Sequence, residues 1–106
     1  METSDSRIIE VNEISEEGCG PILRCGEVAD AALEAIAEDN PGKNVFVIDR
    51  GDYLRINTLG ECKLTRKSME RSLGREFHLP RIEIDMPSFA GRIRTTDNEI
   101  TWYHKI

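Results

Sequence analysis

The region just past the middle of the chain constrains the fold most, because start and stop signals for a helix and a strand follow one another closely there. Thr65 is a typical N-cap, and the apolar Met69 and Leu73 lie one helical turn apart on the face that would be buried. Gly74 is placed to end this helix. Residues 81–86 then alternate between polar and apolar side chains, which predicts a half-buried strand.

Side chains that could carry out a reaction are not grouped in any known pattern along the sequence. The two histidines, His78 and His104, have no partner at the spacing of a metal site. Neither a glycine-rich phosphate loop nor a nucleophile elbow occurs. The odd set of cysteines, Cys19, Cys25 and Cys62, contains no C-x-x-C pair and does not indicate a disulfide framework. We therefore expect a protein without metal or cofactor that works by docking.

Length and charge limit the class of protein further. The chain has 106 residues, enough for one domain with one core, and a net charge of −6. This charge argues against binding to nucleic acid, whose phosphates attract basic proteins. The acidic residues are concentrated in residues 1–44, which hold eleven acids and three bases, whereas the remainder holds nine acids and eleven bases. Different faces of the protein are thus expected to meet differently charged surfaces.

The domain organisation is predicted from composition. Residues 1–17 are acidic and poor in large apolar residues, so we expect a flexible N-terminal tail, followed by a single domain over residues 18–106. The start of the chain is acidic and does not resemble a signal peptide. Acids interrupt the longest apolar run, 28–37, so no membrane span is expected. These features indicate a cytoplasmic protein.

Glycine and proline residues mark the ends of the predicted helices and strands and so indicate their order. A breaker cluster at 18–21 precedes a brief strand at 22–25, and a loop is expected at 87–90. Helices are predicted at 27–38 and 66–73, and the remaining strands at 44–49, 52–57, 61–64, 81–86, 91–94 and 99–104. The pattern describes an α+β fold, in which two strand–helix–strand–strand units form mainly antiparallel sheet packed with two helices.

Charged side chains recur every fourth residue on both predicted helices. The first helix carries an acidic stripe and the second a basic one, which extends just past the helix end. Each stripe fits either a solvated helix face or a docking face for a protein of opposite charge. The residues are Asp30, Glu34 and Glu38 on the first helix, and Lys67, Arg71 and Arg75 on the second.

An ordered set of short motifs resembles a known family. The motifs are Gly20-Pro21-Ile22, Asn40-Pro41-Gly42-Lys43, Asp49-Arg50, Tyr53-Leu54-Arg55-Ile56, Gly60-Glu61, Leu64-Thr65-Arg66-Lys67, Leu73-Gly74-Arg75-Glu76-Phe77 and Ser88-Phe89-Ala90-Gly91-Arg92-Ile93. Together they resemble the effector, or regulatory, proteins of bacterial multicomponent diiron monooxygenases. The likeness is greatest to the toluene 4-monooxygenase effector type, with methane monooxygenase regulatory protein and the phenol hydroxylase effector as more distant relatives.

This resemblance implies a non-catalytic, cofactor-free regulatory component. Such a protein binds the diiron hydroxylase of an aromatic or alkene monooxygenase near its active site, and tunes that site for oxygen activation and coupled turnover. Electrons reach the hydroxylase of such systems through a Rieske-type ferredoxin and a reductase. Competition between the effector and the ferredoxin for the hydroxylase is therefore expected.

Five loop residues are predicted to contact the partner, because loops held by a rigid sheet often carry binding groups. They are Asn40, Lys43, Arg50, Ser88 and Phe89. Local roles are the alternative: Asn40 would cap a helix end, Lys43 would be solvated and Arg50 would pair with a neighbouring aspartate. Phe89 is either a core residue or an exposed aromatic anchor.

Two other functions stay open from the residues alone. Repeated strand–helix–strand units also build small-molecule-sensing regulatory modules, which would associate with themselves and be stabilised by a metabolite. A small cofactor-independent enzyme using Asp49, Arg50 and Tyr53 would instead show turnover by the isolated chain.

Overall fold

The computed structural model describes residues 7–104 and contains eight strands, two α-helices and one 3-10 helix there. The predicted α+β class with mainly antiparallel sheet is confirmed. In chain order the elements are β1 (Ile8–Glu10), β2 (Gly18–Arg24), α1 (Glu27–Asp39), β3 (Val45–Asp49), β4 (Tyr53–Leu59), β5 (Glu61–Thr65), α2 (Arg66–Leu73), the 3-10 helix η1 (Leu79–Asp85), β6 (Ser88–Ala90), β7 (Arg92–Thr95) and β8 (Glu99–Tyr103).

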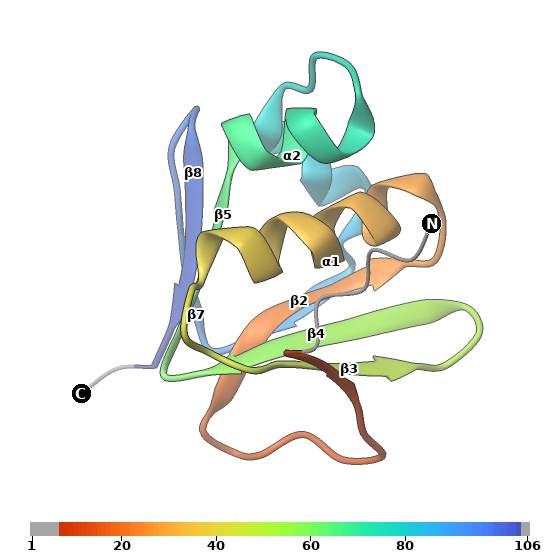
Figure 1. Ribbon diagram of the computed structural model, residues 1–106, viewed down its shortest axis with the longest axis vertical. Helices are drawn as coiled ribbons and strands as arrows, with labels where there is room; N and C mark the ends of the chain where they lie inside the picture. The colour runs from red at the N-terminus through yellow and green to blue at the C-terminus, as the bar shows by residue number, and fades with distance from the viewer. Residues whose placement is uncertain (1–6, 105–106) are drawn as a thin grey trace.

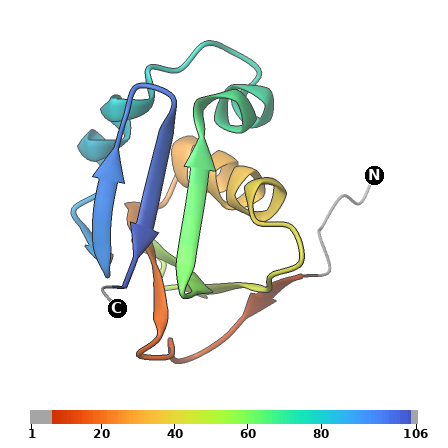
Figure 2. The same cartoon turned by 90° about the vertical axis from the view of Figure 1, so that its left-hand side faces the viewer.

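The strands form two sheets. The larger has five strands in the order β1-β3-β4-β2-β6, antiparallel except for the parallel pair β1-β3, and the smaller has the order β5-β8-β7. Both α-helices lie on the same side of the five-stranded sheet, and the three-stranded sheet stands along one end of it (Figure 1). Figure 2 shows the three-stranded sheet face on, with the helices behind it.

The core lies between α1 and the two sheets. Small side chains on α1, among them Ala29, Ala32 and Ala35, are fully buried and let the helix lie close to its neighbours. The largest fully buried side chain is Trp102 of β8. Burial of one large apolar side chain contributes about 1.5–3 kcal/mol, so this core drives folding. No helix within residues 7–104 has the length and apolar character needed to cross a membrane.

Helix α2 begins and ends as its sequence predicts. The Thr65 hydroxyl accepts a hydrogen bond from the backbone N–H of Ser68 at 3.2 Å, which satisfies one free donor of the first turn. Gly74 follows the helix with φ 78°, a left-handed conformation that favours glycine, and its N–H donates to the carbonyl of Glu70 at 2.8 Å.

The charged stripes of α1 and α2 partly neutralise each other. Arg71 forms an ion pair with Glu38, and Arg75 forms one with Glu27. Both pairs are about half exposed, so each contributes at most about 1 kcal/mol. Arg71 and Arg75, which were predicted to face either a partner or solvent, thus form ion pairs with acidic residues of α1.

The strand predicted at 81–86 is wrong, since residues 81–85 belong to η1 and Met86 follows its end. Pro80 lies in its first turn, where a residue without an N–H is tolerated. The period of a 3-10 helix is three residues, and this places Leu79 and Ile82 together in the core while Ile84 remains 65% exposed. The alternation of apolar residues therefore predicted the two-residue period of a strand, whereas the observed period is three residues.

Two segments predicted as breaks are strands instead. Residues 18–21 form the first half of β2, and 88–90 form β6, an edge strand that pairs with β2. Gly20 has φ 150°, and a Cβ atom there would lie 2.1 Å from the carbonyl oxygen of Ile56. Glycine at this position thus permits a close approach of β2 to β4, whereas the sequence suggested a turn.

The flexible tail predicted for residues 1–17 is wrong for Ile8–Glu10, which form β1. Arg7 explains why this segment is held in place. Its guanidinium group donates to the carbonyl oxygens of Ala37 (2.6 Å), Asn40 (2.8 Å) and Lys43 (3.1 Å). A cation is favoured at a helix C-terminus, and the last turn of α1 has none of its own. Residues 1–6 lie outside the described residues, and the predicted domain boundary stays a prediction.

Candidate docking surface

The five predicted contact residues lie at three separate places on the molecule. Asn40 and Lys43 are in the turn from α1 to β3, and Arg50 is in the turn from β3 to β4. Ser88 and Phe89 are on β6, which is separated from β1 by three other strands of the sheet. The fold therefore does not bring these residues together into one surface.

The Asn40 side chain is buried and fully used inside the protein. Its Nδ2 donates to the carbonyl oxygens of Ile36 at 2.7 Å and Lys63 at 2.9 Å, and its Oδ1 accepts from the backbone N–H of Lys63 at 3.0 Å. The amide thus pairs with both backbone groups of Lys63, as a neighbouring strand would. Its exposed fraction is 6%, so the role of Asn40 is to position the turn.

Side chains at the end of α1 and in the following turn cover the free edge of β5 along its length. The Nζ of Lys43 donates to the carbonyl oxygens of Glu61 at 2.7 Å and Leu59 at 3.0 Å. The carboxylate of Asp39 accepts from the backbone N–H of Thr65 at 2.7 Å. An open strand edge invites pairing with other chains, and here Asp39, Asn40 and Lys43 occupy it. Lys43 is therefore fixed in place, and not simply solvated.

An apolar notch lies beside Lys43, on the face of the five-stranded sheet opposite the helices. It has a volume of about 250 Å³ and is lined by Gly42, Lys43, Asn44, Phe46 and Leu59. Leu59 is 46% exposed. The register places Ile9, another exposed apolar residue, directly beside Phe46. The notch has room for an apolar side chain.

A second hollow lies on the other side of Lys43, with a volume of about 510 Å³. Arg94 of β7 lies over the ring of Tyr103 of β8, with its guanidinium carbon 5.1 Å from the ring centre. His104 also lines this hollow. We call the combined area the Lys43 surface, defined by Ile9, Lys43, Phe46, Leu59, Arg94 and Tyr103. Aromatic residues and arginine are the types that carry most binding energy in protein interfaces.

The sequence analysis missed most of the Lys43 surface. Phe46 lies on the opposite side of β3 from the buried Val45 and Val47, as the alternation of side chains along a strand requires. An aromatic residue on the second face of a strand was thus the available signal. Leu59 and Tyr103 gave no comparable signal, because their exposure depends on how two separate sheets meet.

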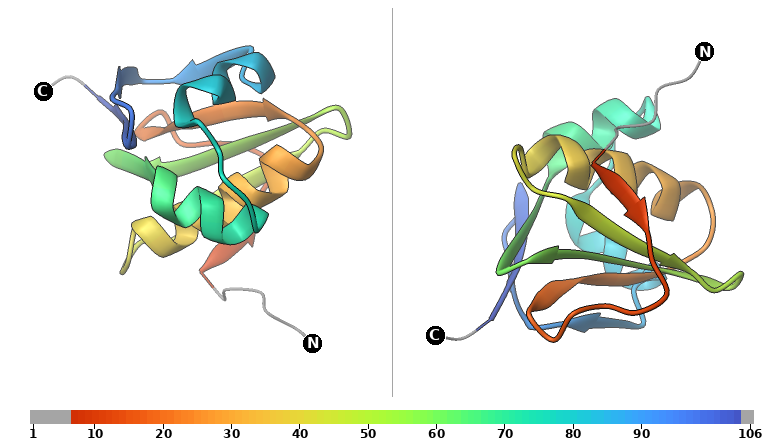
Figure 3. Two further views of the ribbon diagram at one scale, coloured as in Figure 1. Left: turned by 90° about the horizontal axis from the view of Figure 1, so that it is seen from above. Right: turned by 60° about the horizontal axis from the view of Figure 1, so that its bottom comes forward.

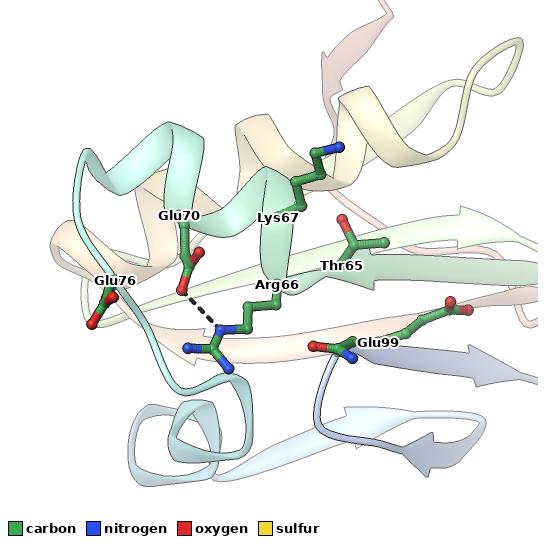
Figure 4. Close-up of a pocket in the computed structure, with 7 residues that line it drawn as sticks. Thr65, Arg66, Lys67, Glu70, Glu76 and Glu99 are labelled. Atoms are coloured by element: carbon green, nitrogen blue, oxygen red, sulfur yellow. Dashed lines mark hydrogen bonds and ion pairs between the residues drawn. The ribbon is translucent and has the colours of Figure 1, made fainter.

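A charged hollow of about 560 Å³ lies between the start of α2 and the turn from β7 to β8 (Figure 4). Arg66 dominates it, but its Nε pairs with the carboxylate of Glu70 at 2.8 Å. Glu70 also accepts from the backbone N–H of Phe77 at 2.9 Å. Arg66 and Glu70 are therefore paired with each other, and Glu70 holds the loop after α2. Within residues 7–104, His, Cys, Asp and Glu side chains do not gather in threes as metal ligands.

Cys25 is an exposed free cysteine, but it lacks the surroundings that would activate a thiol. Partial desolvation and the carboxylates of Asp49, Asp30 and Asp52 raise the pKa of its thiol. Burial raises the pKa of Cys62 to about 12. A reactive cysteine needs a lowered pKa, so these thiols are not poised for nucleophilic chemistry.

Residues 17–103, which include every strand and helix from β2 to β8, match the MmoB/DmpM proteins. The chain belongs to the MmoB/DmpM family. This finding confirms the resemblance to monooxygenase effector proteins that the sequence motifs indicate.

Individual relatives of this MmoB/DmpM protein agree with the family. An effector subunit of an alkene monooxygenase system from Xanthobacter autotrophicus is 50% identical over 95 residues, which cover 90% of this chain and 94% of the relative. A chain in a phenol hydroxylase–regulatory protein complex has the same fold, with TM-score 0.69 and 22% identity over 83% of this chain and 98% of that one. Soluble methane monooxygenase regulatory protein B gives TM-score 0.61 and 25% identity over 91% and 70%.

The other predicted contact residues of this MmoB/DmpM protein are exposed. Phe89 is 37% exposed, so it is not a core residue, although its role as an anchor stays a prediction. Arg50 is exposed in a hairpin turn, where its backbone N–H donates to the carbonyl of Tyr53 at 2.8 Å. In the same turn, Asp49 accepts from the N–H of Gly51 at 2.8 Å. These groups, considered above for an enzyme, thus shape the turn.

We predict that Asn40→Ala lowers the free energy of unfolding by about 3 kcal/mol, because three buried or half-buried backbone groups lose their partner. Urea denaturation of both proteins measures the difference. Asn44→Ala is the matched control, since Asn44 is an exposed asparagine of the same turn and its replacement changes stability by about 0.5 kcal/mol or less. Equal losses in the two variants would contradict the role of Asn40.

We predict that the pKa of Glu70 lies below that of an ordinary glutamate, because the N–H of Phe77 and then the Arg66 guanidinium favour its carboxylate. A lowered pKa in the folded state contributes stability that is present at neutral pH and lost as the pH falls through that value. An NMR titration of the Glu70 carboxyl carbon measures the midpoint. Arg66→Gln should raise the midpoint only in part, because the Phe77 N–H remains. A midpoint that returns fully to the ordinary value would assign the shift to Arg66 alone.

Proposed function

We propose that this chain is the effector subunit of a multicomponent monooxygenase and binds the diiron hydroxylase near its active site. It carries out no reaction itself and tunes the hydroxylase for oxygen activation and coupled turnover. One observation carries this proposal, namely the 50% identity to an alkene monooxygenase effector subunit over 94% of that protein. The same identity favours an alkene over an aromatic hydrocarbon as the substrate of the complex.

The geometry of the Lys43 surface supports a docking role. Arg7, Asn40 and Lys43 fix the turn beside the notch through hydrogen bonds to several elements. A surface that is rigid before binding loses little conformational entropy when a partner docks. Its exposed apolar residues, Ile9 and Leu59, offer area that gains from desolvation.

An effector changes its partner only if it binds two conformations of that partner unequally. Equal affinity for both would leave their populations unchanged. A coupling free energy of about 1–3 kcal/mol changes the populations roughly 5- to 150-fold. Part of the binding energy at the Lys43 surface is therefore used to favour the oxygen-activating form of the hydroxylase.

Electron delivery limits how tightly the effector binds. A Rieske-type ferredoxin that uses an overlapping part of the hydroxylase needs the effector to leave. We therefore infer a dissociation constant on the order of micromolar, or about −8 kcal/mol. Titration of the effector into the hydroxylase, with calorimetric detection, measures this constant. Irreversible capture at picomolar concentration would contradict it.

We predict that adding this chain to its cognate hydroxylase, ferredoxin and reductase raises the amount of product formed per NADH consumed. The physical reason is that the favoured form of the hydroxylase uses the electrons from NADH to oxidise the substrate, and fewer electrons are lost in the reduction of oxygen without product. Parallel measurements of NADH loss and product formation give the ratio. The chain alone should form no product, and a ratio indifferent to its addition would refute the proposed function.

We predict that Leu59→Ala weakens binding to the hydroxylase about tenfold, since it removes an exposed anchor at the notch. Calorimetry on the folded variant measures the change. Ile84→Ala is the matched control, because Ile84 is 65% exposed but lies on η1, away from the Lys43 surface. Phe89→Ala tests the competing prediction. If it weakens binding while Leu59→Ala does not, the docking surface is at β6.

A further inference from the structure

Part of the face of the five-stranded sheet opposite the helices is covered by the chain's own N-terminal segment. Strands β3 and β4 lie between β1 and β2, so residues 11–17, which join β1 to β2, cross this outer face (Figures 1 and 3). We call residues 11–17 the strap. A Cβ atom placed on Gly18 would lie 3.0 Å from a methyl group of Ile14 and 2.4 Å from Oδ1 of Asn57. Ile14 of the strap is therefore packed close to Asn57 of β4.

Hydrogen bonds to the sheet hold the strap at its two ends. The N–H of Val11 donates to the carbonyl of Val47 at 3.0 Å, and the carbonyl of Glu17 accepts from the N–H of Gly60 at 3.1 Å. Between these points the strap is exposed and polar except for Ile14, which is half-buried. Few contacts and an exposed polar sequence are the features of a segment that opens at low cost.

The strap covers polar groups that it does not satisfy. Three buried side-chain polar atoms lack a hydrogen-bond partner in the described part of the chain, and two of them, Arg55 Nε and Asn57 Oδ1, lie on this outer face. Asn57 is fully buried, and Ile48 beside Arg55 is only 4% exposed. A buried donor or acceptor without a partner costs free energy. The covered face is thus better suited to a surface that offers an acceptor to Arg55 and a donor to Asn57.

We propose that the strap is displaced when the hydroxylase docks, and that the uncovered residues Ile48, Arg55 and Asn57 then extend the docking surface. This inference rests on the proposed function. Asn57 pairs in register with Phe46 of the Lys43 surface, so the covered and uncovered areas are continuous. The hydroxylase segment that fits presents an amide, with its carbonyl toward Arg55 and its N–H toward Asn57. Ile48 supplies the apolar contact.

Hydrogen exchange at one backbone amide of the strap tests the displacement. The N–H of Val11 is protected by its bond to the carbonyl of Val47, so it should exchange about tenfold faster or more in the hydroxylase complex than in the free protein. Slower or unchanged exchange in a complex that forms and stimulates turnover would overturn the proposal. Absence of binding or of stimulation would instead contradict the proposed function.

Two variants provide an independent test. Arg55→Met keeps the aliphatic stem but removes the unpartnered donor, and should bind the hydroxylase about tenfold more weakly while the free protein unfolds at no lower urea concentration. Ile14→Ser loosens the strap and should bind about threefold more tightly, because less free energy is spent on opening it. Ile84→Ser, on η1, is the control for adding a polar side chain elsewhere. Unchanged binding of Arg55→Met would show that the covered face makes no contact.

Discussion

The pairing of one side-chain amide with one residue of an edge strand holds much of this structure in register. At the end of α1 the helix leaves carbonyl groups without partners, and β5 presents an open edge nearby. Asn40 meets both requirements, because its amide bonds to the carbonyl of Ile36 and to both backbone groups of Lys63. Arg7 and Lys43 complete the arrangement from either side. The turn that follows α1 is thereby fixed to β1, β4 and β5 at once.

This arrangement explains why a short N-terminal strand belongs to the folded unit. The C-terminus of α1 carries partial negative charge and the helix ends in acids, so it needs a cation that its own last turn lacks. Arg7 supplies it from outside the helix. Asp39, unfavourable at the end of its own helix, is turned toward the first turn of α2, where Ser68 donates to it at 2.6 Å. The acidic end of α1 is thus balanced by groups from other parts of the chain, namely Arg7 and the first turn of α2.

Local signals predicted the parts of the fold that depend on local physics. The cap at Thr65 and the helix end at Gly74 follow from residue types alone, and both are confirmed. The strand predicted at 81–86 failed because Ile82 fits two patterns. With Ile84 it has the two-residue spacing of a strand, but with Leu79 it has the three-residue spacing of a 3-10 helix, and Leu79 and Ile82 are the two that are buried. The Lys43 surface was least predictable. Asn40 and Lys43, whose contact with a partner stays a prediction, bond to backbone groups beside this surface, and its exposed groups come from strands distant in sequence.

The positions of the chain ends have a practical consequence. Arg7 bonds to the carbonyl of Lys43, and His104 lines a hollow beside the same lysine, so both ends of the described chain flank one corner of the molecule. Residues 7 and 104, the first and last that the structure describes, therefore both lie beside the Lys43 surface. Cys25 is exposed near the opposite end of β2, where its N–H bonds to the carbonyl of Asp52 at 2.9 Å. A probe attached through that thiol would therefore stand away from the proposed docking surface and would not obstruct it.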